Sequence, residues 1–300
     1  MDFLIQLIPT FIFLAFCLIP TWLIIKYYDF KNRKRKSPLN IKLLRSPGHS
    51  LRVQIDDITN DIFIPLLFMP TMALLGYAVI LQNLLNDEKD HSFLIALYIG
   101  IVALSTIYLS IKVSNLLKKR NKLRVGLECE IAVGQDLMQL MRHNFRIFHD
   151  FPADQFNIDH IAIGPTGVFA IETKGRSKFV KKEKKNWQVE FSGNTLHFPG
   201  WTETAPVEQA RSQAKWLKNW LQQCTGEPIQ VVPVLALPGW YIKITQASDV
   251  RIYNGKNSLF MTKGNSILTE KQIQRISHQI ERECKDINAL SYPKSEQNGH

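Results

Sequence analysis

Two acidic residues and a lysine stand near one sharp turn in the second half of the 300-residue chain, where they could act together. Glu172 and Lys174 follow the apolar run Val168–Ile171, which is typical of a buried strand. Side chains two residues apart on a strand share a face, so Glu172 and Lys174 should point the same way. Asp159 lies in a second apolar stretch, before the turn Gly164–Gly167. The pattern predicts a hairpin with one carboxylate on each strand.

The register of this hairpin decides whether the two carboxylates meet. If the Pro-Thr pair alone forms the loop, Asp159 faces Glu172 with Cβ atoms roughly 5 Å apart. Two negative charges at that distance are unfavourable unless a cation lies between them, and Mg²⁺ prefers hard oxygen ligands of this kind. Lys174 beside them could hold or polarise an attacking water. A Pro-Thr-Gly loop would instead shift the register by one and turn Glu172 to the opposite face.

The elements around the hairpin predict an α/β domain. Amphipathic patterns predict a helix over 128–142 and another from Pro206 to about Gln223. The apolar run Ile229–Leu237 is typical of a strand covered on both faces, and Thr269 can cap a final helix. The predicted order is helix, three strands, hairpin, helix and buried strand. The other predicted strands are 144–151, 158–163, 168–173, 187–191 and 195–198.

Three stretches of the first half contain no charged side chain and are each about as long as a membrane-spanning helix: Phe3–Ile25, Ile62–Leu85 and Phe93–Ile111. A cleaved signal peptide explains the first stretch poorly, because no basic residue precedes it and no small-residue cleavage site follows. A buried helix pair explains the other two poorly, because both are long and only a short hydrophilic loop separates them. The sequence predicts a membrane anchor with three spans over residues 1–112.

Basic residues set the predicted orientation of these spans. Residues 26–61 hold nine Lys and Arg against four acidic residues, and six more basic residues follow at 112–124. The 86–92 loop holds one Lys and three acidic residues. By the positive-inside rule, we expect residues 26–61 and everything after 112 in the cytoplasm, with the N-terminus and the short loop outside. We therefore predict a multi-pass protein of the cell (inner) membrane, with the lipid bilayer as a partner and a basic juxtamembrane linker at 113–125.

The composition excludes several classes of protein. Hydrophobic residues make up 45% of the chain, which excludes an intrinsically disordered protein. The net charge of +11 could indicate nucleic-acid binding, but +8 of it lies in residues 1–125 and only +3 in 126–300. No charge interrupts the apolar runs, which disfavours a transporter. A disulfide scaffold and a cysteine zinc ribbon are excluded because no C-x2-C spacing occurs among Cys17, Cys129, Cys224 and Cys284.

Longer motifs around the hairpin resemble those of a known family. The run Ile158-Asp-His-Ile-Ala-Ile-Gly-Pro-Thr-Gly-Val-Phe-Ala-Ile-Glu-Thr-Lys174 resembles the signature of the nuclease-related domain, NERD, a branch of the PD-(D/E)xK nuclease superfamily. Gly126-Leu-Glu-Cys-Glu130-Ile-Ala-Val resembles the opening helix of that family, and Pro206-Val-Glu-Gln209-Ala resembles its later helix. The motifs occur in the family's order over roughly residues 124–240. Cys129 stands where the family usually has Gly, which leaves Glu128 as a rival of Glu130.

The resemblance implies a fold, an activity and a set of site residues. The fold would be a restriction-endonuclease-like αβββαβ domain over 126–290, followed by a polar tail at 291–300. The activity would be hydrolysis of phosphodiester bonds with Mg²⁺ or Mn²⁺, and the expected substrate is DNA. The cation would polarise the phosphate and activate a water, which Lys174 would orient. The implied residues are Glu130, Asp159 and Glu172 as metal ligands, with Lys174 and Gln209 as further catalytic residues.

A lysine-rich segment after the predicted catalytic strand has two interpretations. It could be a solvated loop, or it could contact the phosphate groups of a bound nucleic acid near Lys174. We predict the second as the sharper hypothesis. Its members are Lys178, Lys181, Lys182, Lys184 and Lys185.

A second hypothesis for the whole chain is a catalytically silent module that binds nucleic acid or protein at the membrane. The clustered carboxylates argue against it, since a tether needs none. His160 follows Asp159 on the opposite strand face and is expected to pack in the domain rather than bind a metal.

Overall fold

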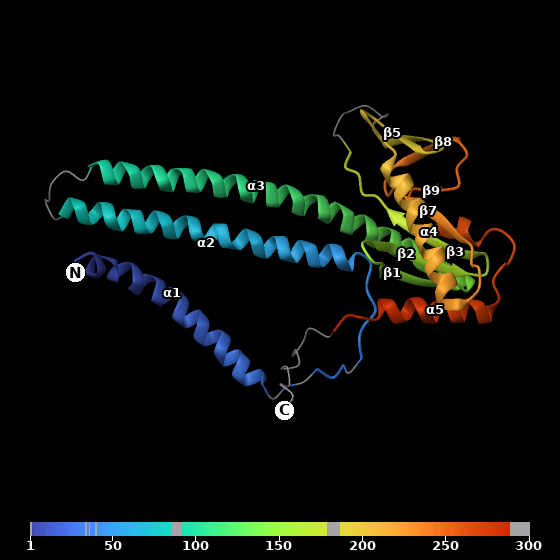
Figure 1. The fold of residues 1–300 in the computed structure, drawn as a ribbon, viewed down its shortest axis with the longest axis horizontal. Coiled ribbons are helices and arrows are strands. Elements are labelled where there is room, and N and C mark those ends of the chain that lie inside the picture. Colours follow the sequence, from blue (N-terminus) through green and yellow to red (C-terminus); the bar gives the residue numbers. More distant parts are fainter. Residues whose placement is uncertain are drawn as a thin grey trace. The chain divides into compact units, whose positions relative to one another are not determined.

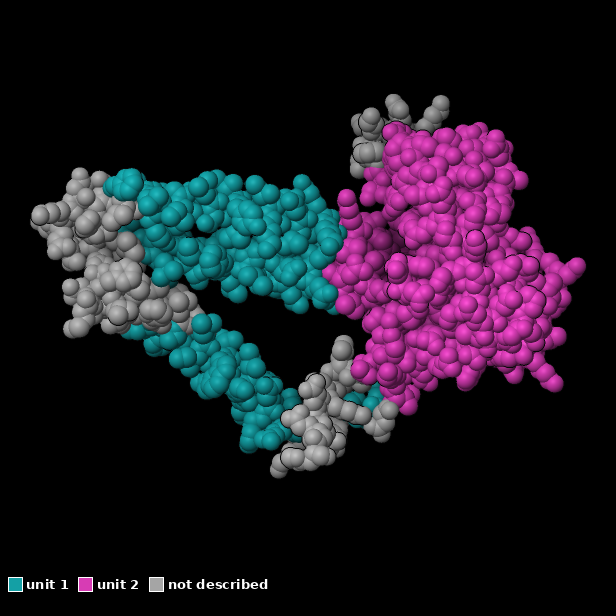
Figure 2. Space-filling view, in the orientation of Figure 1, with its two compact units in different colours: residues 1–40, 56–121, 289–300 teal, residues 41–55, 122–288 magenta. Residues whose placement is uncertain are grey.

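The computed structural model describes residues 2–33, 35, 37–39, 41–85, 92–178 and 187–288. The chain divides into two compact units, which Figure 2 shows in two colours. One unit comprises residues 1–40, 56–121 and 289–300, and the other comprises residues 41–55 and 122–288. The second unit therefore includes a short segment from the sequence between the first two apolar runs.

Three long helices carry the apolar runs: α1 (Asp2–Asn32), α2 (His49–Leu85) and α3 (Ser92–Leu137) (Figure 1). Within the described residues, two helical stretches are long and apolar enough to cross a membrane, His49–Tyr77 and Ile95–His143. α1 is helical as predicted but is not one of these two. The predicted anchor of three spans is therefore supported for two of them, by length and composition.

The helices of the first unit expose much apolar surface. In α2 and α3 the side chains of Phe63, Ile64, Phe93 and Leu104 are all more than half exposed. The two helices also contact each other, because the Tyr98 hydroxyl donates a hydrogen bond to the carbonyl oxygen of Met72 at 2.7 Å. Large exposed apolar surfaces mark a contact with protein or membrane.

α3 is longer than the sequence analysis predicted. The predicted linker 113–125 and the predicted separate helix 128–142 both lie on one helical stretch, whose last turns form the 3-10 helix η1 (Met138–His143). Residues 113–125 contain no Gly or Pro and several Leu, Lys and Arg, which are strong helix formers, so no signal ends the helix there. Asn144, with a φ of 61°, terminates η1 in the left-handed conformation that Asn tolerates.

A five-stranded sheet forms the centre of the second unit, in the order β1-β2-β3-β7-β9. The first three strands are antiparallel neighbours, whereas β7 runs parallel to β3 and β9 runs parallel to β7. With α3 before the strands and a helix before β7, the unit has the predicted order of helix, three strands, helix and strand. The bounds are β1 (Arg146–Pro152), β2 (Asn157–Gly164), β3 (Gly167–Thr173), β7 (Val231–Ala236) and β9 (Arg251–Tyr253).

The β2–β3 hairpin has the two-residue loop on which the sequence argument depends. Gly164 pairs with Gly167, and His160 pairs with Ile171. Gly167 has a φ of 132°, a conformation that glycine adopts without strain. Continuing this register by one residue places Asp159 opposite Glu172. The predicted register is confirmed, and the three-residue loop is wrong.

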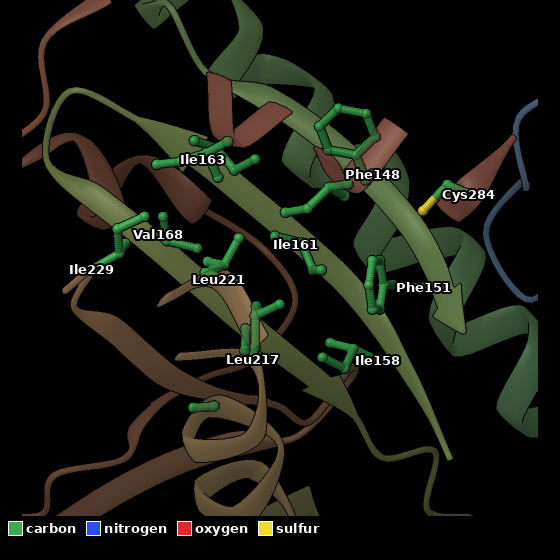
Figure 3. Close-up of a cluster of buried hydrophobic side chains, with 14 of the residues drawn as sticks. Phe148, Phe151, Ile158, Ile161, Ile163, Val168, Leu217, Leu221, Ile229 and Cys284 are labelled. Carbon is green, nitrogen blue, oxygen red and sulfur yellow. The ribbon is translucent and has the colours of Figure 1, made fainter. Parts of the chain in front are cut away.

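Helices α4 (Ala205–Thr225) and α5 (Glu270–Cys284) cover one face of this sheet, and Figure 3 shows the core that they share with it. α4 contributes Leu217 and Leu221 to this core because its apolar residues recur at helical spacing. α5 begins at the predicted cap, where the Thr269 hydroxyl and the Gln272 side chain bind each other's backbone amides. The opposite face packs against the end of α3, η1 and the 3-10 helix η3 (Ser258–Thr262).

A second, four-stranded sheet lies beside α4, in the order β6-β5-β4-β8. The predicted hairpin of 187–191 and 195–198 is confirmed as β4 and β5. The sequence analysis did not predict β6 or β8, which are short or exposed along most of their length. Val189, Phe191 and Trp240 form the core between this sheet and α4. The bounds are β4 (Gln188–Ser192), β5 (Thr195–Phe198), β6 (Trp201–Glu203) and β8 (Tyr241–Gln246).

Candidate active site

The predicted acidic residues come from three elements of the second unit. Asp159 lies on β2, Glu172 lies near the end of β3, and Glu130 lies on the last turns of α3. Glu130 and Glu172 are buried, at 6% and 2% exposure. Repulsion from Glu172 acts on both Glu130 and Asp159, and repulsion from Glu130 acts on Asp159, so the three carboxylates lie close enough to interact. We call these three residues the acidic cluster.

Two short contacts fix the carboxylates of the strands. The Lys174 ammonium forms an ion pair with Glu172, on the shared strand face that the sequence predicted. The backbone amide of Thr173 donates a hydrogen bond to the Asp159 carboxylate at 2.6 Å. The hairpin thus holds Asp159 with its own backbone and Glu172 with the lysine two residues later.

The charges of the acidic cluster are poorly compensated. Burial, followed by repulsion from Asp150 and Glu172, raises the pKa of Glu130 to about 8. Burial, followed by repulsion from Glu172 and Glu130, raises the pKa of Asp159 well above its usual range. Lys174 lowers both pKa values, but by less than burial and repulsion raise them. Such an excess of buried negative charge is typical of sites that bind a cation or exchange protons.

The two candidates for the helix ligand are separated by their exposure. Glu128 is exposed, whereas Glu130 is buried and belongs to the acidic cluster. Two residues along a helix correspond to a rotation of about 200°, so only one of the pair can face the sheet. The structure therefore brings Glu130 to the site and leaves Glu128 outside it.

The glutamine at the site is Gln213 and not the predicted Gln209. Gln213 is 2% exposed, and its Nε2 donates hydrogen bonds to Glu172 at 2.6 Å and to the Asn157 carbonyl oxygen at 3.2 Å. Gln209 lies one turn earlier on α4 and is exposed. The sequence carried a signal for Gln213, since it is a polar residue beside Ala214 on the apolar face of the helix.

The side-chain oxygen of Gln213 is an acceptor that receives no hydrogen bond from the described residues. Both partners of Nε2 are acceptors, which fixes the orientation of the amide group. Its Oε1 is buried and has no hydrogen-bond partner within the described part of the chain. A buried acceptor without a donor is costly, so a water or another donor at this position would stabilise the site.

A fourth carboxylate, Asp150, lies near the cluster and was missed by the sequence analysis. It is 3% exposed and has a φ of 51°. Its carboxylate contacts Arg45 at 3.1 Å and accepts hydrogen bonds from the Ser50 hydroxyl at 2.6 and 2.8 Å. Arg45 and Ser50 precede Asp150 by about a hundred positions, and no local pattern links them to it.

Of the five lysines predicted to contact nucleic acid, the structure describes one, Lys178. Lys178 is exposed, but its ammonium donates a hydrogen bond to the Gly239 carbonyl oxygen and lies 5.5 Å from the centre of the Trp240 ring. The preceding Arg176 forms a two-point contact with Glu203 at 2.7 and 2.9 Å. These contacts join the loop after β3 to the second sheet. The predicted contacts at Lys181, Lys182, Lys184 and Lys185 lie outside the described residues.

His160 is packed in the domain as expected. It is fully buried and pairs with His149 across β1 and β2, with the two Nδ1 atoms 2.9 Å apart. Burial lowers the pKa of His149 to about 4 and holds that of His160 well below its usual range, so both are neutral at neutral pH.

The donor chemistry of the acidic cluster fits a hard divalent cation. Carboxylate oxygens are the ligands that Mg²⁺ and Mn²⁺ prefer, and their excess negative charge would be relieved by one. Within the described residues, however, no three His, Cys, Asp or Glu side chains stand in an arrangement ready to hold an ion. The lysine ion pair and the hydrogen bonds from Thr173 and Gln213 instead occupy carboxylate oxygens.

The second unit is thus an α/β domain that gathers carboxylates and a lysine beside one hairpin. Residues 125–238 match the family model of the nuclease-related domain, NERD. The chain therefore carries a nuclease-related domain, and the resemblance noted from the motifs is confirmed. No match to a curated protein or to a solved structure was found.

Proposed function

We propose that the nuclease-related domain is a cation-dependent nuclease that hydrolyses the phosphodiester bonds of DNA. One observation supports this proposal most strongly. Glu130, Asp159 and Glu172, from one helix and two strands, lie near Lys174 in a domain that matches the nuclease-related family. The order of helix, three strands, helix and strand supports assignment to the PD-(D/E)xK superfamily and its restriction-endonuclease-like fold.

Each residue of the site has a role in this proposal. Glu130, Asp159 and Glu172 would hold Mg²⁺, for which Mn²⁺ could substitute. When bound, the ion would polarise the phosphate and make a water more acidic. Lys174 would orient the attacking water and neutralise charge that develops on the phosphate. The Thr173 amide holds Asp159 in place for this role, as its hydrogen bond indicates.

We also propose that the chain is anchored in the cell (inner) membrane with the nuclease-related domain in the cytoplasm. Two apolar helices and the basic residues that flank them support this arrangement, and α1 would supply a third span. Reporter fusions within residues 86–91 and at the C-terminus should then report opposite sides of the membrane. The same side for both fusions would contradict the three-span topology.

The nuclease proposal is tested with the full chain in detergent, because residues 41–55 belong to the same compact unit as the domain. The protein is incubated with plasmid DNA, single-stranded DNA and RNA, each with Mg²⁺, with Mn²⁺ and with a chelator. We expect cleavage of DNA that the chelator stops and that the Asp159→Asn variant lacks. Binding without cleavage under every metal condition would favour the catalytically silent module instead.

A further inference from the structure

A short segment outside the family match is built into the domain. Residues 41–50 come before α2 or form its first turn, whereas the match begins at residue 125. Leu43 and Ile287 exchange two backbone hydrogen bonds of 2.8 and 3.2 Å, and the Arg45 amide donates to the Cys284 carbonyl oxygen at 3.0 Å. The segment is thus fixed to the end of α5.

The side chain of Arg45 ties this segment to two carboxylates. Its Nη1 donates to the Asp150 carboxylate at 3.1 Å and to the Asp150 carbonyl oxygen at 3.2 Å. Its Nε and Nη2 donate to Asp286 at 2.9 and 2.5 Å. Arg45 is suited to this role because its planar guanidinium can engage both carboxylates at once. Ser50 adds its amide and hydroxyl to the partners of Asp150.

The same segment reaches the acidic cluster. The backbone of Gly48 lies beside the Glu130 carboxylate and lowers the pKa of that carboxyl. Gly48 has a φ of 66°, and a Cβ at this position would collide with the side chain of Leu127 and lie 3.5 Å from the Glu130 carboxylate. Glycine is therefore favoured at this position, where the segment lies against α3.

We propose that residues 41–50 belong to the candidate active site and help to position the Glu130 carboxylate, with Arg45 as a positioning residue. By holding Asp150 and the segment that carries Gly48, Arg45 keeps the Glu130 carboxylate where it can bind the divalent cation. This inference rests on the proposed function. Groups that orient a metal ligand without touching the metal typically change metal affinity by about 10- to 100-fold.

The test measures Mn²⁺ affinity of the full chain in detergent, by titration below the unfolding temperature of each variant. Arg45→Met keeps a long side chain but removes the guanidinium, and we expect affinity to fall by about 10- to 100-fold. Ser50→Ala is the milder variant, and we expect a smaller loss. Arg52→Met is the matched control, since Arg52 is exposed on the first turn of α2, two residues after Ser50, and the Mn²⁺ affinity of this variant should be unchanged.

A second readout separates positioning from a loss of folded protein. At saturating Mn²⁺, cleavage by folded Arg45→Met should return to within a few-fold of the parent rate, because the reacting groups remain. Wild-type Mn²⁺ affinity in both folded Arg45→Met and Ser50→Ala would overturn this inference and leave the nuclease proposal intact. If the parent protein binds no Mn²⁺, the proposed function and this inference fall together.

Discussion

Two sets of carboxylates in the second unit differ in their partners: Asp150 on β1, and the acidic cluster, whose members lie on α3, β2 and β3. Asp150 on β1 is surrounded by donors, since Arg45 and Ser50 supply hydrogen bonds to both of its oxygens. In the acidic cluster of Glu130, Asp159 and Glu172, the nearby cation is Lys174, which pairs with Glu172. One group is compensated within the fold, and the other is short of positive charge.

The degree of charge compensation distinguishes a carboxylate that only stabilises the fold from one that can bind a cation. A buried charge that is fully paired is already at a low free energy and gains little from a ligand. A buried cluster that repels itself gains when a cation arrives, and the fold bears its cost until then. Exposure alone would not distinguish the groups, because Asp150, Glu130 and Glu172 are all buried.

The largest expected effect is the loss of cleavage in Asp159→Asn. The amide keeps an acceptor for the Thr173 amide but removes the charge that a cation needs. We expect cation-dependent cleavage to fall by more than about 100-fold, beyond the range for groups that only support a metal ligand. Cleavage rates of DNA with Mg²⁺ measure it, with circular dichroism to establish folding. Cleavage at the parent rate would remove Asp159 from the site.

The next effect separates two lysines that follow the same strand. Lys174→Ala should lower the cleavage rate by about 100-fold, the scale for losing one electrostatic stabiliser. Lys178→Ala should change the rate little, because its ammonium is bound to the Gly239 carbonyl oxygen. DNA binding should weaken only modestly in Lys174→Ala, since a single lysine–phosphate contact would be one among several. Equal cleavage rates in the two variants would contradict the special role of Lys174.

A third comparison concerns two glutamines one turn apart on α4. Gln213→Leu removes the hydrogen bond to Glu172 and should lower cation affinity and cleavage by about 10- to 100-fold. Gln209→Leu, at an exposed position, should leave both unchanged. Titration with Mn²⁺ and the cleavage assay provide the two measurements. The opposite ranking would show that the family position, rather than the buried one, serves the site.

The smallest effect is one of stability, and its sign differs between the two groups of carboxylates. Asp150→Asn weakens its bonds to Arg45 and should lower the free energy of unfolding by about 1–3 kcal/mol. Asp159→Asn relieves repulsion and should raise it modestly when no cation is bound. Chemical denaturation with a chelator present measures both. A loss of stability of the same size in both variants would mean that the two groups are not different in kind.

The sequence predicted the hairpin and its contents well because those features are local. The Gly-Pro-Thr-Gly turn, the apolar strands and the alternation of side chains together predicted that Asp159 faces Glu172 and that Lys174 shares its face. The boundary between the linker and the helix after it was missed, because α3 continues through residues with no helix-breaking signal. Gln209 was preferred to Gln213 because the motif marks a position but not the direction of its side chain.

The sequence by itself determined that this protein has an apolar helical region and an α/β domain with carboxylates on one hairpin. Hydrophobic periodicity and turn chemistry act over a few residues, so they can be read without the fold. Only the tertiary structure decided which carboxylates are compensated. Arg45 and Asp150 are 105 positions apart in the sequence, and only folding brings them into contact. The free energy of a buried charge depends on every partner around it, and those partners exist only once the chain has folded.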